Sequence, residues 1–214
     1  MAAAPPLRIG VTGHRVPPKL PEKSEAPLRD QIDRLFAAFI AAEGNATRDL
    51  IIVSSLAEGS DRIVSEAGLS AGFRLEAVLP FNRSEYMRDF ETEASRKEFG
   101  QLLTRASDVF ELDGASDQRP RAYEAAGLFM LANIDLLIAI WDGQPAAGIG
   151  GTEAIVNRAI ADGLIVVWIE PIHPHAIKTS FPAGADAKSD TKFHLADITT
   201  VAQVIEKTIF HRPR

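Results

Sequence analysis

Short apolar runs alternate with amphipathic segments along most of the chain. Runs of strand length occupy residues 7–12, 50–55, 73–80, 107–112, 135–141 and 164–170. Several are apolar on both faces, which is typical of strands in a parallel sheet that helices cover on both sides. Between the runs, apolar residues recur at helical spacing, as in 27–44 and from about 152 to 162. The pattern predicts an α/β fold with a mostly parallel sheet of about six or seven strands and helices on both faces.

Two segments depart from this alternation. Residues 83–106 are rich in charge and predict one or two surface helices. Residues 171–194 lack periodicity and are rich in Pro, Ala, Ser and Asp, so we expect a long, partly mobile loop there, with room for a short strand. A last amphipathic helix begins near Ile198. No interdomain linker stands out, and we expect a single domain over residues 1–214.

Composition narrows the choice of partners. The formal net charge of −6 argues against broad binding to DNA or to anionic membranes, since affinity for either depends on a basic surface. A small anionic ligand needs only a local positive field. The chain has no cysteine, which excludes disulfides, thiolate nucleophiles and zinc–cysteine sites. The first residues lack the pattern of a signal peptide, and we expect a cytoplasmic protein.

The loops that follow the predicted strands hold the candidate chemistry, because ligands of open parallel sheets bind beyond the carboxyl ends of the strands. The first, second and fifth strands lead into small, hydroxyl-bearing and charged residues. These candidate ligand-binding residues are Gly13, His14, Arg15, Ser54, Ser55, Gly59, Asp61, Asp142, Gly143, Gly150, Gly151 and Thr152. The pattern predicts that they lie along one edge of the sheet.

Several of these residues also have a purely structural interpretation. Gly13 fits a turn, and His14 and Arg15 fit a solvated loop. Ser60 and Asp61 fit the cap of a helix. His173 and His175 stand two residues apart with no third ligand nearby, so we assign no metal site.

The stretch Gly150–Gly151–Thr152 lies between a buried strand and a helix. Glycines there allow a tight turn. They also allow close approach of an anion to the exposed N–H groups of the first helical turn, where the Thr152 hydroxyl adds a donor. The residues alone leave both interpretations open.

Three motifs together resemble a known superfamily. They are "IGVTGHR" (9–15), "SSLAEGSDRIVSEA" (54–67), and "LLIAIWDG" (136–143) followed by "GIGGTEAIV" (148–156). In order and spacing they are similar to the SLOG superfamily, which includes the DNA-uptake protein DprA and the LOG phosphoribohydrolases. The resemblance covers most of residues 7–170 and implies a Rossmann-like fold that binds a nucleotide or a nucleotide derivative. Relatives often dimerise, so it also implies a possible homodimer.

By position, the resemblance implies a phosphate at Gly150, Gly151 and Thr152. It places Gly13, Ser54, Ser55, Gly59 and Asp61 on the opposite wall, and sets Asp142 and Gly143 where the LOG motif begins.

The sequence departs from the LOG enzymes at their catalytic pair. Their glutamate lies three residues after the motif threonine, which is Ile155 here, and their arginine aligns with Ala126. Cleavage of an N-glycosidic bond needs charge stabilisation as the sugar becomes cationic, so we assign no catalytic residue and no cofactor.

Three functions remain open. The first is binding or sensing of a nucleotide without catalysis. The second is cleavage of a ribose–base bond by a rearranged site that uses Glu153, Asp142 or Glu58. The third is DprA-like binding of single-stranded DNA, against which the net charge counts.

Overall fold

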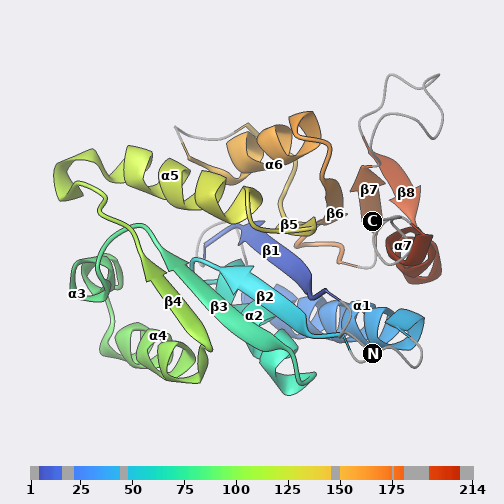
Figure 1. Cartoon of the computed structure of the whole chain (residues 1–214), viewed down its shortest axis with the longest axis horizontal. Helices are drawn as coiled ribbons and strands as arrows, with labels where there is room; N and C mark the ends of the chain where they lie inside the picture. Colours follow the sequence, from blue (N-terminus) through green and yellow to red (C-terminus); the bar gives the residue numbers. More distant parts are fainter. Residues whose placement is uncertain are drawn as a thin grey trace.

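The structure of the chain is a computed structural model that describes residues 5–15, 22–43, 48–145, 150–174, 176–180 and 193–207. Its strands form one eight-stranded sheet in the order β4-β3-β2-β1-β5-β6-β7-β8 (Figure 1). The strands are β1 (Leu7–Gly13), β2 (Leu50–Ser54), β3 (Arg74–Leu79), β4 (Asp108–Glu111), β5 (Leu136–Ile140), β6 (Ile165–Ile169), β7 (Ile177–Ser180) and β8 (His194–Ala196). Each of the six apolar runs forms the predicted strand.

The sheet is parallel from β4 to β6, and β7 and β8 extend it with antiparallel pairs. The predicted α/β fold with a mostly parallel, Rossmann-like sheet is confirmed. The chain winds outward from β1 to β4, then returns to β5 on the other side of β1. The strand order therefore reverses between β1 and β5, and a crevice opens at such a switch point in α/β sheets.

The segment 171–194 is only partly a loop. β7 lies inside it, and β8 begins at its last residue. Residue 175 and residues 181–192 lie outside the described part of the chain, so the expected mobility is not addressed there.

Helices cover both faces of the sheet, as predicted (Figure 1). One face carries α1 (Glu25–Glu43), α2 (Ser60–Ser70), α4 (Glu93–Arg105) and α7 (Ile198–Ile205), and the other carries α5 (Arg119–Leu131) and α6 (Thr152–Ala161). Short turns complete the chain at η1 (Glu22–Ser24), α3 (Arg83–Tyr86), η2 (Met87–Asp89) and η3 (Ser116–Gln118). Two apolar cores result, one on each face, because successive side chains of a strand point to opposite sides.

The charged segment 83–106 contributes to the core, which the sequence pattern did not predict. Tyr86, Phe90 and Phe99 are buried together with Phe81 of the preceding loop. Their rings lie close, with centroids 5.2 Å apart for Tyr86 and Phe90 and 4.9 Å apart for Phe90 and Phe99. This aromatic cluster holds α3 against the end of β3 and places Tyr86 beside the strand ends.

Candidate functional site

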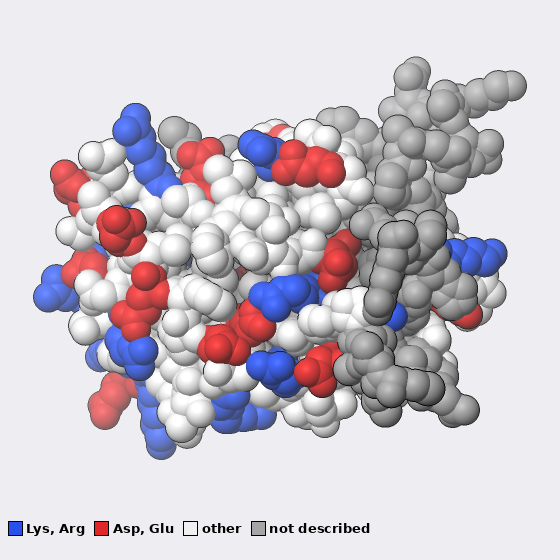
Figure 2. All heavy atoms as spheres, in the orientation of Figure 1, with Lys and Arg blue, Asp and Glu red and all other residues white. Residues whose placement is uncertain are grey.

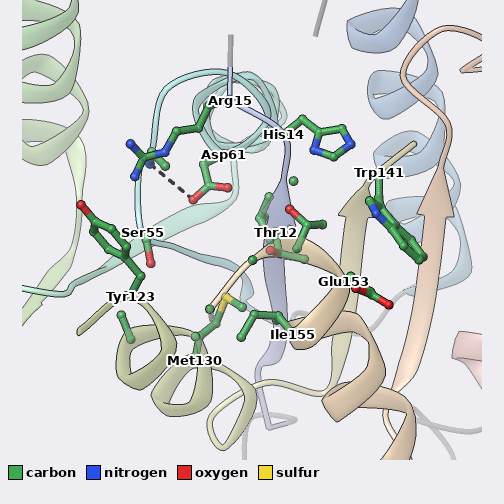
Figure 3. Close-up of a pocket in the computed structure, with 18 of the residues that line it drawn as sticks. Thr12, His14, Arg15, Ser55, Asp61, Tyr123, Met130, Trp141, Glu153 and Ile155 are labelled. Carbon is green, nitrogen blue, oxygen red and sulfur yellow. Dashed lines mark hydrogen bonds between the residues drawn. The ribbon is translucent and has the colours of Figure 1, made fainter. Parts of the chain in front are cut away.

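A cavity of about 370 Å³ opens at the carboxyl ends of β1 and β5, where the strand order reverses (Figure 3). The loop after β1 and the loop after β5 form two of its walls, and residues of α2, α3, α5 and α6 form the others. This is the location and the size expected for a small-molecule site in an open α/β sheet.

The cavity gathers many of the residues that the sequence singled out. Its lining includes Gly13, His14, Arg15, Ser55, Asp61, Gly150, Gly151 and Thr152. Ser54, Gly59, Asp142 and Gly143 are not part of the lining. Ser54 and Asp142 instead contact lining residues, as the Ser54 Oγ to Asp61 Oδ2 bond of 3.3 Å shows. The structure thus brings the candidates together, while their role in binding stays a prediction.

Gly13 allows three elements to meet at the bottom of the site. A Cβ atom at this position would lie 2.5 Å from Ser60 Cβ and 2.8 Å from the Ile140 carbonyl oxygen. Ser60 donates to the His14 carbonyl oxygen from its backbone N at 3.1 Å and from its Oγ at 2.8 Å. Ser60 therefore ties α2 to the loop after β1. The cap interpretation is wrong, because the N-cap residue is Gly59, with no capping side-chain bond.

His14 joins the two loops of the switch point. It is buried, so the solvated interpretation of its side chain is wrong. Its Nε2 lies 2.9 Å from both the backbone N and the Oδ1 of Asp142. Whichever tautomer is present, this nitrogen bonds to Asp142 and holds the loop after β5 against the loop after β1.

Asp61 places a carboxyl group in the cavity wall although its side chain is almost fully buried, with 6% exposed. Its Oδ2 accepts from Ser54 Oγ at 3.3 Å and from the Ala57 backbone N at 3.4 Å. Burial raises the pKa of Asp61 to about 6, against the smaller opposing effects of the Ala57 hydrogen bond and the Arg15 charge. The group is therefore mainly a carboxylate at neutral pH.

Arg15 brings a positive charge to the same side of the cavity (Figure 3). Its Cζ lies 5.4 Å from the centre of the Tyr123 ring. The Tyr123 hydroxyl donates to Asp89 Oδ2 at 2.5 Å, and Arg119 also bonds to Asp89 at 2.5 Å. The ring is thus a fixed platform. The guanidinium above it forms no hydrogen bond to any described residue, which leaves its donors open to a ligand.

The start of α6 forms the wall nearest to the glycine stretch. Gly150 has a φ of 77°, and a Cβ atom there would lie 2.8 Å from the Glu124 backbone N and 2.9 Å from the Pro120 carbonyl oxygen. The turn interpretation therefore accounts for Gly150. Gly151 is the N-cap, without a capping side-chain bond, and Thr152 begins the helix. Both residues line the cavity, so the first turn of α6 borders it.

Glu153 is the second residue of α6 and also lines the cavity. In Figure 3 its carboxylate lies on the side of Trp141, away from Arg15. A carboxylate in the first helical turn is favourable for the helix dipole, and it would repel a second anion placed next to it.

The two positions that align with the LOG catalytic pair meet in this cavity. Ala126 of α5 and Ile155 of α6 both line it, together with Met130 (Figure 3 labels Ile155 and Met130). The corresponding wall is apolar, and it offers neither an acid nor a cation.

Sequence reasoning missed two tyrosines of the site. Tyr86 and Tyr123 both line the cavity. Tyr123 recurs at helical spacing with Ala126 and Met130, a pattern that favours core packing, and Tyr86 stands in the segment 83–106, which predicted surface helices. The position of Tyr86 shortly after the third strand was the available signal, since residues at strand ends face the site.

Within the described ranges, the structure contains neither a candidate metal site nor a helix that could span a membrane. No group of three His, Asp or Glu side chains there is placed to hold a metal ion. His173 Nδ1 lies 2.7 Å from Glu170 Oε2, and His175 is outside the described part of the chain. No described helix is long and apolar enough to cross a membrane.

No family model and no curated protein matches the chain. DNA processing protein A (DprA) from Streptococcus pneumoniae is similar in structure, with 18% identity, a TM-score of 0.50, and coverage of 77% of this chain and 50% of that one. The chain therefore has a DprA-like fold. DprA from Helicobacter pylori is 16% identical, with a TM-score of 0.49 and coverage of 94% of this chain and 73% of that one.

The DprA-like fold agrees with the fold that the three sequence motifs implied. The chain spans about half the length of the Streptococcus protein. At this level of identity the likeness concerns the fold, and function has to be argued from the cavity itself.

Proposed function

We propose that the chain binds or senses a nucleotide or a nucleotide-derived molecule in the cavity between β1 and β5. The observation that carries the proposal is the position of the cavity at the topological switch point, where a DprA-like sheet leaves room for a ligand. Its lining contains both polar groups and apolar surface, as a ligand with charged and aromatic parts requires. The proposal also includes a single domain over residues 1–214 and a cytoplasmic location.

The phosphate of the ligand is proposed to lie at the start of α6. The N–H groups of the first turn favour an anion, and the Thr152 hydroxyl adds a donor. Arg15 adds a positive charge to the cavity on the side away from Glu153. The Glu153 carboxylate would repel the phosphate, so replacement of Glu153 tests whether the phosphate lies at this position.

The proposal includes binding and excludes LOG-type hydrolysis. The support is the apolar wall of Ala126, Met130 and Ile155, where such an enzyme needs a cation and a carboxylate. We therefore assign no catalytic residue.

A thermal-shift screen identifies the ligand class. Nucleoside mono-, di- and triphosphates, dinucleotides and ADP-ribose are each added to the parent protein. A compound present at about a hundred times its Kd adds about 2.7 kcal/mol, or roughly 5–10 °C in Tm for a chain of this size. The absence of any shift across these compounds contradicts the proposed function.

Thr152→Val is expected to weaken binding of the best compound by about 1–3 kcal/mol, because a charged phosphate loses one hydrogen bond. Isothermal titration calorimetry measures the change in Kd. The valine keeps the shape of the side chain, so the Tm of the ligand-free protein is expected to stay close to that of the parent.

Glu153→Gln is expected to have the opposite effect on affinity to that of Thr152→Val. It removes the competing carboxylate from the same helical turn, and binding is expected to tighten. If both variants bind as the parent does, the phosphate does not lie at α6 and the glycine stretch serves the turn alone.

Single-stranded DNA is expected not to bind tightly at physiological salt, although the Helicobacter protein has a single-stranded DNA binding mode. On the face in Figure 2, Lys and Arg side chains lie among Asp and Glu side chains. Many arginines are paired, as Arg105 with Glu66 at 2.7 Å and Arg29 with Asp33 at 3.0 Å. Fluorescence anisotropy with labelled oligonucleotides measures this. A submicromolar Kd with a steep salt dependence contradicts it.

A further inference from the structure

Tyr86 is a buried residue whose polar atom lies at the cavity. Its side chain is 1% exposed, and it belongs to the lining. Phe90 and Phe99 hold its ring at centroid distances of 5.2 Å and 5.6 Å. The hydroxyl forms no hydrogen bond to any residue within the described ranges. Because Tyr86 lines the cavity, its hydroxyl is available to a ligand that enters there.

Charged groups of both signs surround this hydroxyl. Arg15, Asp61 and Asp89 all lie within electrostatic reach of it. Burial raises the pKa of Tyr86, so the phenol keeps its proton and remains able to donate. Asp61 also lines the cavity and presents a carboxyl group that accepts. A phenol donor, a carboxylate acceptor and a guanidinium donor thus face one region of the cavity.

This combination selects one kind of chemical group. A phosphate would accept from Tyr86 and Arg15 but would be repelled by the Asp61 carboxylate. An amine would donate to Asp61, but it would offer Tyr86 no acceptor and would be repelled by Arg15. A neutral group that both donates and accepts satisfies all three residues.

We propose that Tyr86 and Asp61 form a second subsite of the cavity, which binds a neutral donor–acceptor group of the nucleotide. The inference rests on the proposed function and adds to it the residues that read the uncharged part of the ligand. Two parts of a nucleotide have this chemistry, namely the hydroxyls of the sugar and the amide or amino edge of the base.

The test uses AMP, GMP, CMP, UMP and ADP-ribose as probes, with calorimetry on the parent protein and on Tyr86→Phe. The variant keeps the ring in its aromatic cluster and removes only the oxygen. Because this oxygen has no partner among the described residues, the Tm of the ligand-free variant is expected to equal or exceed that of the parent. The Kd of the tightest-binding probe is expected to rise roughly three- to tenfold.

Thr179→Val is the matched control. Thr179 carries a buried hydroxyl without a partner among the described residues, and it lies in β7 and does not line the cavity. Its removal is expected to preserve the Kd of the same probe. An equal loss of affinity in both variants would show a general effect of core hydroxyls and would overturn the subsite.

Modified probes identify the group that Tyr86 contacts. If it is a sugar hydroxyl, the 2′-deoxy or 3′-deoxy form of the best probe binds the parent more weakly, with no further loss in Tyr86→Phe. If it is the base edge, a probe whose base lacks its exocyclic groups shows this behaviour instead. When the deoxy probes and the base-modified probes all lose the same factor in Tyr86→Phe as the unmodified probe does, the hydroxyl contacts none of these groups and the inference is wrong.

The two proposals fail in different ways. A probe that binds the parent and Tyr86→Phe with equal Kd overturns the second subsite and leaves the proposed function in place. If neither these probes nor any compound of the thermal-shift screen binds the parent, the proposed function itself is contradicted, and the subsite with it.

Discussion

Replacement of Asp61 by asparagine is expected to stabilise the ligand-free protein at pH 8 by about 3 kcal/mol. Burial raises the pKa of this carboxyl from its ordinary 3.8 to about 6. Between these pH values the unfolded chain has lost the proton and the folded chain still holds it. Stability therefore falls as pH rises from about 4 to 6, and the cost persists above that range. A shift of about two pKa units corresponds to about 3 kcal/mol.

Asparagine never ionises, and its side-chain oxygen can still accept from the Ala57 backbone N. Chemical denaturation of both proteins at pH 4 and pH 8 measures the effect. The difference is expected to vanish at pH 4, where the parent carboxyl is protonated in the folded state.

Asp117→Asn is the control, because it removes a carboxylate that is exposed, in η3, instead of a buried one. It is expected to change stability little at either pH. A parent protein that is more stable than Asp61→Asn at pH 8 would show that the buried carboxylate is well compensated. Otherwise the chain retains a destabilising charge in its cavity, which is common where the charge serves a ligand.

Replacement of Arg62 by leucine is expected to destabilise the protein by about 3 kcal/mol, because it leaves a buried carbonyl unpaired and shortens a buried side chain. Arg62 is 2% exposed. Its Nε donates to the Leu56 carbonyl oxygen at 3.1 Å, and its Nη1 donates to the Ser95 carbonyl oxygen at 3.0 Å. It thereby connects the loop after β2 with the start of α4. Urea denaturation measures the loss.

Glu98→Gln separates this effect from the ion pair. Arg62 Nη1 lies 2.6 Å from Glu98 Oε2, but Glu98 is half exposed, so this pair is expected to contribute less than about 1 kcal/mol. If Glu98→Gln and Arg62→Leu lose the same free energy of unfolding, the contribution of Arg62 to stability comes from the ion pair instead. Leu56 has a φ of 56°, and the neighbouring Ser55 and Ala57 line the cavity, so Arg62 also supports the wall of the site.

Local patterns were sufficient for the framework of the fold. The six apolar runs became β1 to β6, because a strand buried on both faces needs apolar side chains at nearly every position. The gathering of Gly13, Asp61 and Thr152 around one cavity was also predictable, since parallel strands end at the same edge of the sheet.

Contacts between distant segments lay beyond these patterns. The burial of Arg62 depends on Leu56, Ser95 and Phe90, which reach it from three different segments. Tyr86 and Phe99 lie in a stretch of charged residues, and only their packing against Phe90 shows that this stretch faces inward. Such residues are too widely spaced along the chain for a periodic signal.

The sequence by itself determined the α/β class, the parallel strands, and the edge of the sheet that carries the candidate residues. Each of these follows from periodicity and from glycine, which act over a few neighbouring residues. The tertiary structure alone decided that Ala126 and Ile155 line one cavity as apolar residues and that Tyr86 lines it together with Asp61 and Arg15. Those arrangements arise because helices from separate crossovers pack on one sheet, and no local pattern specifies which of their residues meet.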